Sequence, residues 1–229
     1  MLLKLQTHSH HHSQYMVSYM KLFVAFVFTL LPLAAVFAQD SSSQKPPEPP
    51  AETPGGQKKP VAVVQTSMGS FEMELYPADA PKTVENFTKL AAKKYFDGMR
   101  FHRVAKGFVI QTGDDNSKDT AKMNRWGTGG KSIWGNEFAD ELNPEAHSYK
   151  EGYKAGVVAM ANRGPNTNTS QFFICLQDVN LPHSYTIFGK VTKGMDVVRK
   201  IGSVDILPAG ATDGRPKKDV MVKKISMKK

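Results

Sequence analysis

Residues 101–114 read FHRVAKGFVIQTGD, and this stretch decides the fold that the sequence predicts. Its apolar residues alternate with other residues as they do in short strands, and it ends in a Gly-Asp turn. One arginine, Arg103, stands among them. A guanidinium cannot lose its charge, so an apolar setting costs free energy unless the charge has a partner or a task. Arg103 is therefore the first candidate functional residue.

Short strands are predicted on both sides of this stretch as well. Alternating or continuous apolar runs indicate eight strands, at residues 61–65, 71–75, 100–104, 108–111, 157–160, 171–176, 186–191 and 220–225. Helical spacing of apolar residues indicates two helices, one beginning at Lys82 and a short one at residues 195–201. Strands and helices do not alternate, which argues against a parallel sheet. Because a single antiparallel sheet of this size has edges, we expect it to close into a barrel.

The composition is that of a globular protein with a real core. The chain has 229 residues, of which 40% are hydrophobic, and its formal net charge is +9. A mildly basic balance favours solubility, with weak attraction to acidic surfaces as the alternative. The single cysteine, Cys175, excludes an intrachain disulfide, and its apolar neighbours predict a small buried side chain rather than a nucleophile.

The N-terminal region has the pattern of a secretory signal. Residues 20–38 begin with Met20 and Lys21, continue as an apolar run broken by Pro32, and end in Val-Phe-Ala. We expect this signal to be cleaved and the protein to be exported, periplasmic or secreted; an uncleaved membrane anchor is the alternative. Residues 1–19 would then lie upstream of the true start at Met20. Residues 39–60 are rich in Ser and Pro and predict a linker before a domain over residues 61–229.

Two further blocks are as distinctive as the first. Residues 160–174 read MANRGPNTNTSQFFI and residues 188–191 read FGKV, while residues 127–133, GTGGKSI, form a glycine-rich segment. Taken together with residues 101–114, these blocks resemble the cyclophilin family of peptidyl-prolyl cis-trans isomerases. The resemblance covers roughly residues 61–225. It implies a mainly-β fold, a closed eight-stranded antiparallel β-barrel capped by two α-helices, in agreement with the pattern of elements.

The resemblance also implies the roles of the site residues. Arg103 matches the catalytic arginine of the family. The residues that match its substrate-binding pocket are Phe108, Val109, Gln111, Ala161, Asn162, Gln171, Phe173, Leu181 and Tyr185. His102, beside Arg103, is expected to be a packed histidine and not a proton shuttle.

The chain departs from the usual family pattern at four of its positions. Val109 replaces a methionine, Thr169 a glycine and Tyr185 a histidine, and Asn180 stands where many eukaryotic members carry tryptophan. Valine and tyrosine can still line an apolar pocket, so proline binding is expected to survive. The loss of tryptophan puts tight binding of the drug cyclosporin in doubt.

The chemistry that the family performs needs no cofactor, metal, base or nucleophile, because rotation about an X-Pro bond breaks no covalent bond. It needs an apolar pocket for the proline ring and donors that favour the twisted amide. We therefore expect an isomerase that assists the folding of exported, proline-containing polypeptides. A proline-peptide binding module or chaperone with little turnover is the alternative.

Other partners are not expected. Nucleic-acid association through the lysines near the C-terminus is a weaker idea, since the chain has no aromatic interleaving or recognition motif. Contact with a membrane is expected only if the signal is not cleaved. We expect the domain to be a monomer.

Overall fold

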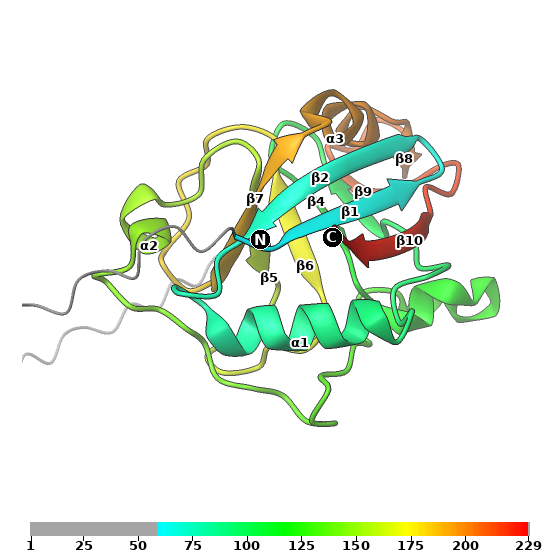
Figure 1. The fold of residues 1–229 in the computed structure, drawn as a ribbon. Coiled ribbons are helices and arrows are strands. Elements are labelled where there is room, and N and C mark those ends of the chain that lie inside the picture. The colour runs from blue at the N-terminus through cyan, green and yellow to red at the C-terminus, as the bar shows by residue number, and fades with distance from the viewer. Residues whose placement is uncertain (1–58, 229) are drawn as a thin grey trace, which may run out of the picture. The chain divides into compact units, whose positions relative to one another are not determined.

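The computed structural model describes residues 59–228. Ten strands form one antiparallel sheet in the order β10-β1-β2-β7-β5-β6-β4-β3-β9-β8 (Figure 1). The strands are β1 (Val61–Thr66), β2 (Gly69–Leu75), β3 (Arg103–Ala105), β4 (Val109–Thr112), β5 (Val157–Met160), β6 (Phe172–Cys175), β7 (Ile187–Lys193), β8 (Ile206–Leu207), β9 (Asp213–Pro216) and β10 (Val222–Met227). The helices are α1 (Pro81–Ala92), α2 (His147–Glu151) and α3 (Met195–Gly202), with two 3-10 helices, η1 (Asp115–Lys118) and η2 (Thr120–Arg125).

The alternation in the sequence explains the first hairpin. β1 and β2 pair in a continuous register from Val61 opposite Glu74 to Thr66 opposite Gly69. Ala62 and Val64 are fully buried because they share the face of β1 that meets the core. The hairpin predicted from the sequence is thereby confirmed.

α1 packs one face onto the core at the side of the sheet opposite α3 (Figure 1). Pro81 occupies its first turn, where the missing N–H costs nothing. The carboxylate of Glu141 accepts hydrogen bonds from the backbone N–H of Lys82 at 3.0 Å and of Thr83 at 2.8 Å. A distant loop therefore supplies the N-terminal cap that the residues before α1 lack.

The closed eight-stranded barrel with two helices is not confirmed. All eight predicted strands are present, but β8 and β9 add a hairpin at one end of the sheet, and the described residues hold three α-helices. The residues before β3 do approach the start of β10: Phe101 N–H donates to the carbonyl of Val220 at 2.9 Å, and Arg100 and Met221 form an isolated bridge. The reason is local: β3 begins only at Arg103, so the preceding residues form no continuous ladder with β10.

The central strands are buried on both faces. In β6, Phe172 and Ile174 join the main core, whereas Phe173 and Cys175 belong to a second apolar cluster on the other face. Strands that are buried on both faces consist of continuous apolar residues, which is why β5 and β6 show no alternation of apolar and polar residues. The apolar wall of the candidate site belongs to the second cluster.

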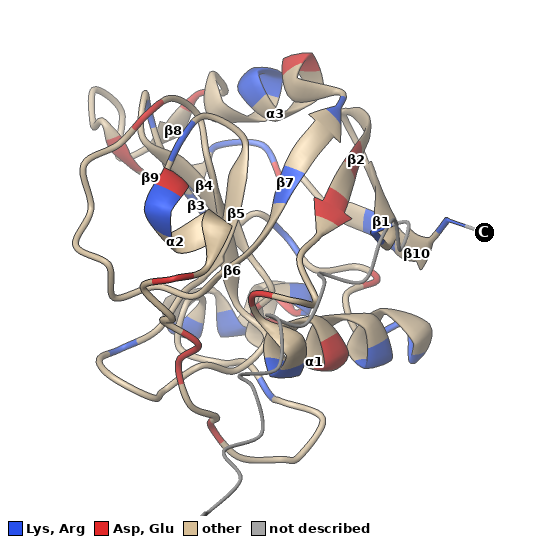
Figure 2. Ribbon diagram, turned by 60° about the vertical axis from the view of Figure 1, so that its left-hand side comes forward, with Lys and Arg blue, Asp and Glu red and all other residues tan. Residues whose placement is uncertain are grey.

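Several sequence-based predictions lie outside the described residues. These are the upstream segment 1–19, the signal 20–38 and the linker 39–60 except its last two residues. Within residues 59–228, the helices are all too short or too polar to cross a membrane. Charges of both signs occur on α1 and on α3 (Figure 2).

Candidate active site

A row of side chains crosses four strands on one face of the sheet. Arg103 on β3 lies opposite Gln111 on β4, Gln111 lies opposite Phe173 on β6, and Phe173 lies opposite Ala159 on β5. Directly opposed residues in antiparallel strands point to the same face. The register thus brings a cation, an amide and an aromatic ring together, although they are far apart in the sequence.

Arg103, Gln111 and Phe173 of this row line a pocket of about 250 Å³. Nine of the ten site residues predicted from the sequence line it: Arg103, Phe108, Val109, Gln111, Ala161, Asn162, Phe173, Leu181 and Tyr185. Its apolar side chains belong to the second cluster, so the pocket wall is a continuation of packed structure. The polar groups lie at Arg103, Gln111 and Asn162.

Gln171 is the one predicted residue that does not line this pocket; it lines a smaller neighbouring pocket of about 80 Å³. Its Nε2 donates to the carbonyl oxygens of Gly127 at 3.0 Å and Gly129 at 2.7 Å. Its Oε1 therefore accepts from Gln111 Nε2 at 2.9 Å, and Gln111 Oε1 accepts from Arg103 Nη1 at 3.2 Å. Through this relay the glycine-rich loop fixes the orientation of both amides and of one side of the guanidinium.

Arg103 has a second partner that the sequence analysis missed. Asp213, at the start of β9, accepts from Nε at 3.0 Å and from Nη2 at 2.6 Å. β9 holds only four residues, two of them Gly and Pro, and no apolar pattern marks it. Only the pairing of β9 with β3 makes the contact evident, so no signal in the sequence could have identified Asp213.

Asn162 offers its backbone to the pocket. Its side-chain Nδ2 donates to the carbonyl of Ser184 at 2.8 Å, which anchors the residue. Among residues 59–228, no group bonds to the main-chain N–H or C=O of Asn162. Both remain available to an extended peptide lying along the pocket.

Tyr185 is fixed at the end of the pocket by Tyr153. The hydroxyl of Tyr153 donates to the carbonyl of Tyr185 at 2.9 Å and accepts from its N–H at 3.0 Å. Burial raises the pKa of Tyr153 to about 12, so the hydroxyl keeps its proton for this bond. The rings of Tyr185 and Phe173 meet edge to face at 5.6 Å, which closes the apolar wall.

His102 lies beside Arg103 but is buried, and neither ring nitrogen has a hydrogen-bond partner within the described residues. Burial, with a smaller contribution from the charge of Arg103, lowers the pKa of His102 to about 4. The side chain of Gln171 and the backbone of Arg100 oppose this shift without cancelling it. The imidazole is therefore neutral at pH 7, as a packed histidine should be.

Within residues 59–228 there is neither an exposed thiol nor a cluster of metal ligands. Cys175 is fully buried, and burial raises the pKa of its thiol to about 12. No group of three or more His, Cys, Asp or Glu side chains in this part of the chain could hold a metal ion. What the arrangement offers is an apolar pocket with fixed hydrogen-bond donors at its rim.

Fold and pocket together define a mainly-β protein that can receive an extended peptide beside an arginine. Residues 61–227 match the family described as "Cyclophilin type peptidyl-prolyl cis-trans isomerase/CLD". The chain therefore belongs to the cyclophilin-type peptidyl-prolyl cis-trans isomerases, and the resemblance inferred from the sequence is confirmed.

Individual relatives agree with this assignment. The chain is 46% identical over 165 residues to a "Peptidyl-prolyl cis-trans isomerase-like 1" of Neurospora crassa, covering 70% of this chain and 90% of the relative. It is 44% identical over 168 residues to the mouse "Peptidylprolyl isomerase domain and WD repeat-containing protein 1", covering 73% of this chain but only 24% of that relative. The match to the mouse protein thus spans about a quarter of its length.

A solved structure shows the same fold. The crystal structure of a cyclophilin-type peptidyl-prolyl cis-trans isomerase from Cryptosporidium parvum superimposes with a TM-score of 0.65 at 31% identity. The superposition covers 75% of this chain and 99% of the other.

Proposed function

We propose that the protein accelerates cis-trans rotation of X-Pro peptide bonds, with Arg103 as its catalytic residue. The observation that carries this proposal is the position of the Arg103 guanidinium at the rim of an apolar pocket in a cyclophilin-type fold. The pocket, at about 250 Å³, is smaller than the clefts of roughly 300–1,000 Å³ that take drug-sized ligands. It suits a single small ring.

The chemical task is to favour a twisted amide. The barrier to rotation is about 18–20 kcal/mol and arises from the loss of amide resonance. On twisting, the lone pair of the prolyl nitrogen becomes available to accept a hydrogen bond. A guanidinium N–H directed to that nitrogen therefore stabilises the transition state more than the planar ground state, which is the condition for catalysis.

The other pocket residues position the substrate in this proposal. Phe108, Val109 and Phe173 surround the pyrrolidine ring, and Leu181 and Tyr185 close the pocket behind it. The backbone of Asn162 holds the peptide beside the ring. If these effects together remove ~5 kcal/mol from the barrier, the rate rises by about 10³–10⁴ at ~1.4 kcal/mol per decade.

The test is a proline-peptide isomerisation assay on the full-length protein and on Arg103→Ala. Removal of one preorganised donor typically costs about 10²–10³ in rate, so we expect Arg103→Ala to lower kcat/KM by about that factor. Arg199→Ala, which removes an exposed arginine of α3, is the matched control. An unchanged kcat/KM in Arg103→Ala would contradict the proposed role.

The departures from the usual family residues at Val109, Thr169 and Tyr185 support a second candidate function. The protein would then bind proline-containing segments and turn over slowly. Measurable affinity for a proline peptide without any rate enhancement would favour this binding module over the isomerase.

We further propose that the clients are exported polypeptides and that the isomerase assists their folding outside the cytoplasm. Support comes from the positive start, apolar run and small-residue end of residues 20–38. The N-terminal residue of the mature protein tests this directly. A mature chain that begins near Gln39 is expected, whereas a chain that retains residues 20–38 would contradict cleavage.

A further inference from the structure

We propose that Asp213 is a positioning residue for Arg103, an inference that rests on the proposed isomerase function. Asp213 holds one edge of the guanidinium, so that the remaining donors are presented to the substrate. It stands outside the set of described residues that line the pocket, and it therefore acts through Arg103.

The contact is two-pronged. Arg103 Nε lies 3.0 Å from Oδ1 and 3.2 Å from Oδ2 of Asp213, and Nη2 lies 2.6 Å from Oδ2. Parallel N–H···O bonds of this kind fix the plane of a guanidinium as well as its distance. A single bond would leave the group free to swing about its long side chain.

These contacts leave some N–H donors of Arg103 free to bind the substrate. A guanidinium has five N–H donors; Asp213 engages Nε and one donor of Nη2, and Gln111 engages one donor of Nη1. One N–H on each terminal nitrogen remains for the peptide. Asp213 and Gln111 thus hold the group from two sides without exhausting its donors.

The backbone fixes the carboxylate in turn. Asp213 lies opposite Ala105, and Gly214 lies opposite Val104, in the pairing of β9 with β3. Arg103 is two residues before Ala105, on the same face, which places it diagonally across from Asp213 and within reach of a long side chain.

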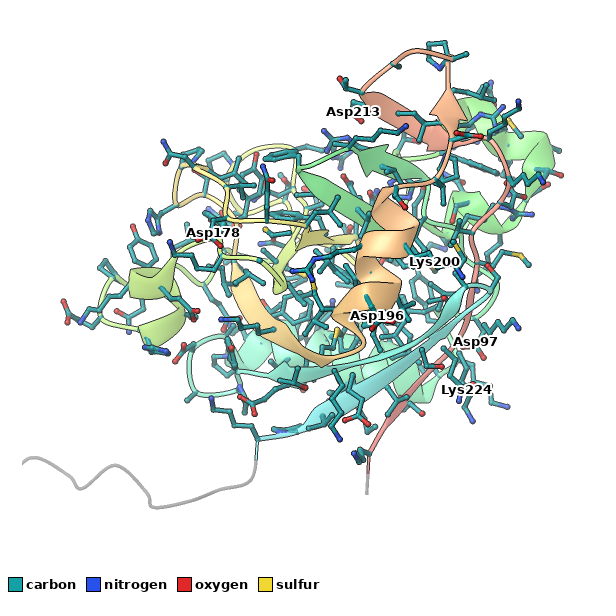
Figure 3. All side chains as sticks on the ribbon, turned by 90° about the horizontal axis from the view of Figure 1, so that it is seen from above. Asp97, Asp178, Asp196, Lys200, Asp213 and Lys224 are labelled. Atoms are coloured by element: carbon teal, nitrogen blue, oxygen red, sulfur yellow. The ribbon has the colours of Figure 1, made fainter. Side chains whose placement is uncertain are left out.

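The hairpin behind Asp213 is equally tight. A Cβ on Gly214 would meet the carbonyl oxygen of Leu207 at 2.1 Å, so β8 and β9 approach closely. On the other side, Lys106 N–H donates to the carbonyl of Thr212 at 2.7 Å. Figure 3 shows Asp213 on the β9 strand next to the loop that precedes it.

Stability alone does not explain this ion pair. The side chains of Arg103 and Asp213 are 39% and 47% exposed, and ion pairs at such exposure contribute little to folding. Removal of the Asp213 carboxylate should therefore lower kcat and leave the free energy of unfolding almost unchanged. This difference separates a positioning role from a structural one.

The first test compares kcat and KM of the full-length protein with those of Asp213→Ala and Asp213→Asn. Misplacement of a catalytic group by about 1 Å can cost about 10²-fold, and Gln111 still holds one side, so we expect Asp213→Ala to lower kcat by about tenfold. KM should change little, and Asp213→Asn, which keeps one acceptor oxygen, should fall between. Wild-type kcat in Asp213→Ala, or an increase, would overturn the inference.

A matched control is available at the other end of the same segment. Asp219 pairs with Arg100 Nε at 2.6 Å, and neither residue lines the pocket within the described part of the chain. Asp219→Ala removes an arginine–carboxylate contact without touching Arg103, so it should leave kcat unchanged. In an Arg103→Ala background, Asp213→Ala should have no further effect on kcat.

A second readout does not depend on activity. The Nε–H proton signal of Arg103, assigned by its loss in Arg103→Ala, should exchange with water faster in Asp213→Ala than in the wild type. Equal exchange rates would overturn the inference even if the protein proved to be inactive. Faster exchange in a protein without isomerase activity would instead refute the proposed function and leave the positioning contact in place.

Discussion

At the scale of single residues, Arg103 and His102 are neighbours in the chain, but only Arg103 carries a charge. Arg103 keeps its charge beside Asp213, whereas His102 is buried and neutral, with its pKa lowered to about 4. The charge of Arg103 itself disfavours a second positive charge on the neighbouring imidazole. Arg103 is thus the one charged side chain among the described residues that line the pocket.

The lowered pKa of His102 makes stability depend on pH. In the unfolded chain the imidazole takes up a proton near pH 6.5, whereas in the folded protein it does so only near pH 4. The stabilisation is therefore fully present above pH 6.5 and is lost as the pH falls toward 4. The loss from His102 alone is about 3 kcal/mol at pH 4, from ~1.4 kcal/mol per pKa unit.

Denaturant unfolding of the wild type and of His102→Leu at pH 7 and pH 4.5 measures this effect. The variant should lose less stability on acidification than the wild type, whatever its stability at pH 7. His147→Gln is the control for removal of an exposed imidazole. Equal losses in the wild type and in His102→Leu would show that His102 is not the responsible group.

At the scale of secondary-structure elements, the sequence predicted what depends on apolar periodicity. The eight strands predicted from the sequence and the helices α1 and α3 each lie in a segment that shows that signal. β8 and β9 do not: β8 holds only two residues, β9 is the polar segment Asp-Gly-Arg-Pro, and each pairs only because the rest of the sheet supplies a partner. α2 was missed because, among its five residues, only Ser148 is buried.

The candidate site divides in the same way. The lining residues Phe108, Val109 and Phe173 lie in blocks that can be recognised from the sequence, and the pocket brings them together. Asp213 lies in the unpredicted β9, so its approach to Arg103 depends on a strand pairing that no local pattern announces. Site residues that lie in short, polar strands are thus the ones that could not be predicted from the sequence.

The glycine-rich loop offers a prediction at this scale. A Cβ on Gly129 would approach Oδ1 of Asp114 at 2.2 Å and Oδ1 of Asp115 at 2.7 Å. Gly129→Ala must therefore displace the loop, and the carbonyl that accepts from Gln171 moves with it. We expect a lower kcat/KM and a loss of about 1–3 kcal/mol in the free energy of unfolding, as for other overpacked sites.

Gly135 provides the comparison for this substitution. It lies in the same connecting segment at φ +84, and a Cβ there would meet nothing within 4 Å. Gly135→Ala therefore introduces backbone strain without a clash at the relay, and kcat/KM should stay near the wild-type value. A similar loss of kcat/KM in both variants would mean that the loop acts only through general stability.

At the scale of the whole molecule, one sheet serves two apolar layers. The main core lies between the sheet and α1, where the ring of Phe172 meets those of Phe87 and Phe96 edge to face at 5.7 and 5.9 Å. The opposite face of the same strands carries the second cluster, which includes the pocket wall at Phe173. A binding surface built on strands that are already fixed by the core needs little ordering when a peptide binds.

Phe172 and Phe173 separate these two layers experimentally, because adjacent residues of β6 point to opposite faces. Phe172→Ala empties a site within the main core and should lower the free energy of unfolding by about 3–5 kcal/mol. The molecules that remain folded should keep most of their kcat/KM. Phe173→Ala should cost less stability, because its ring borders the open pocket, but it removes the apolar wall and should raise KM for a proline peptide. Urea unfolding and isomerisation kinetics on both variants measure the two quantities, and parallel losses of stability and activity would contradict the separation into two layers.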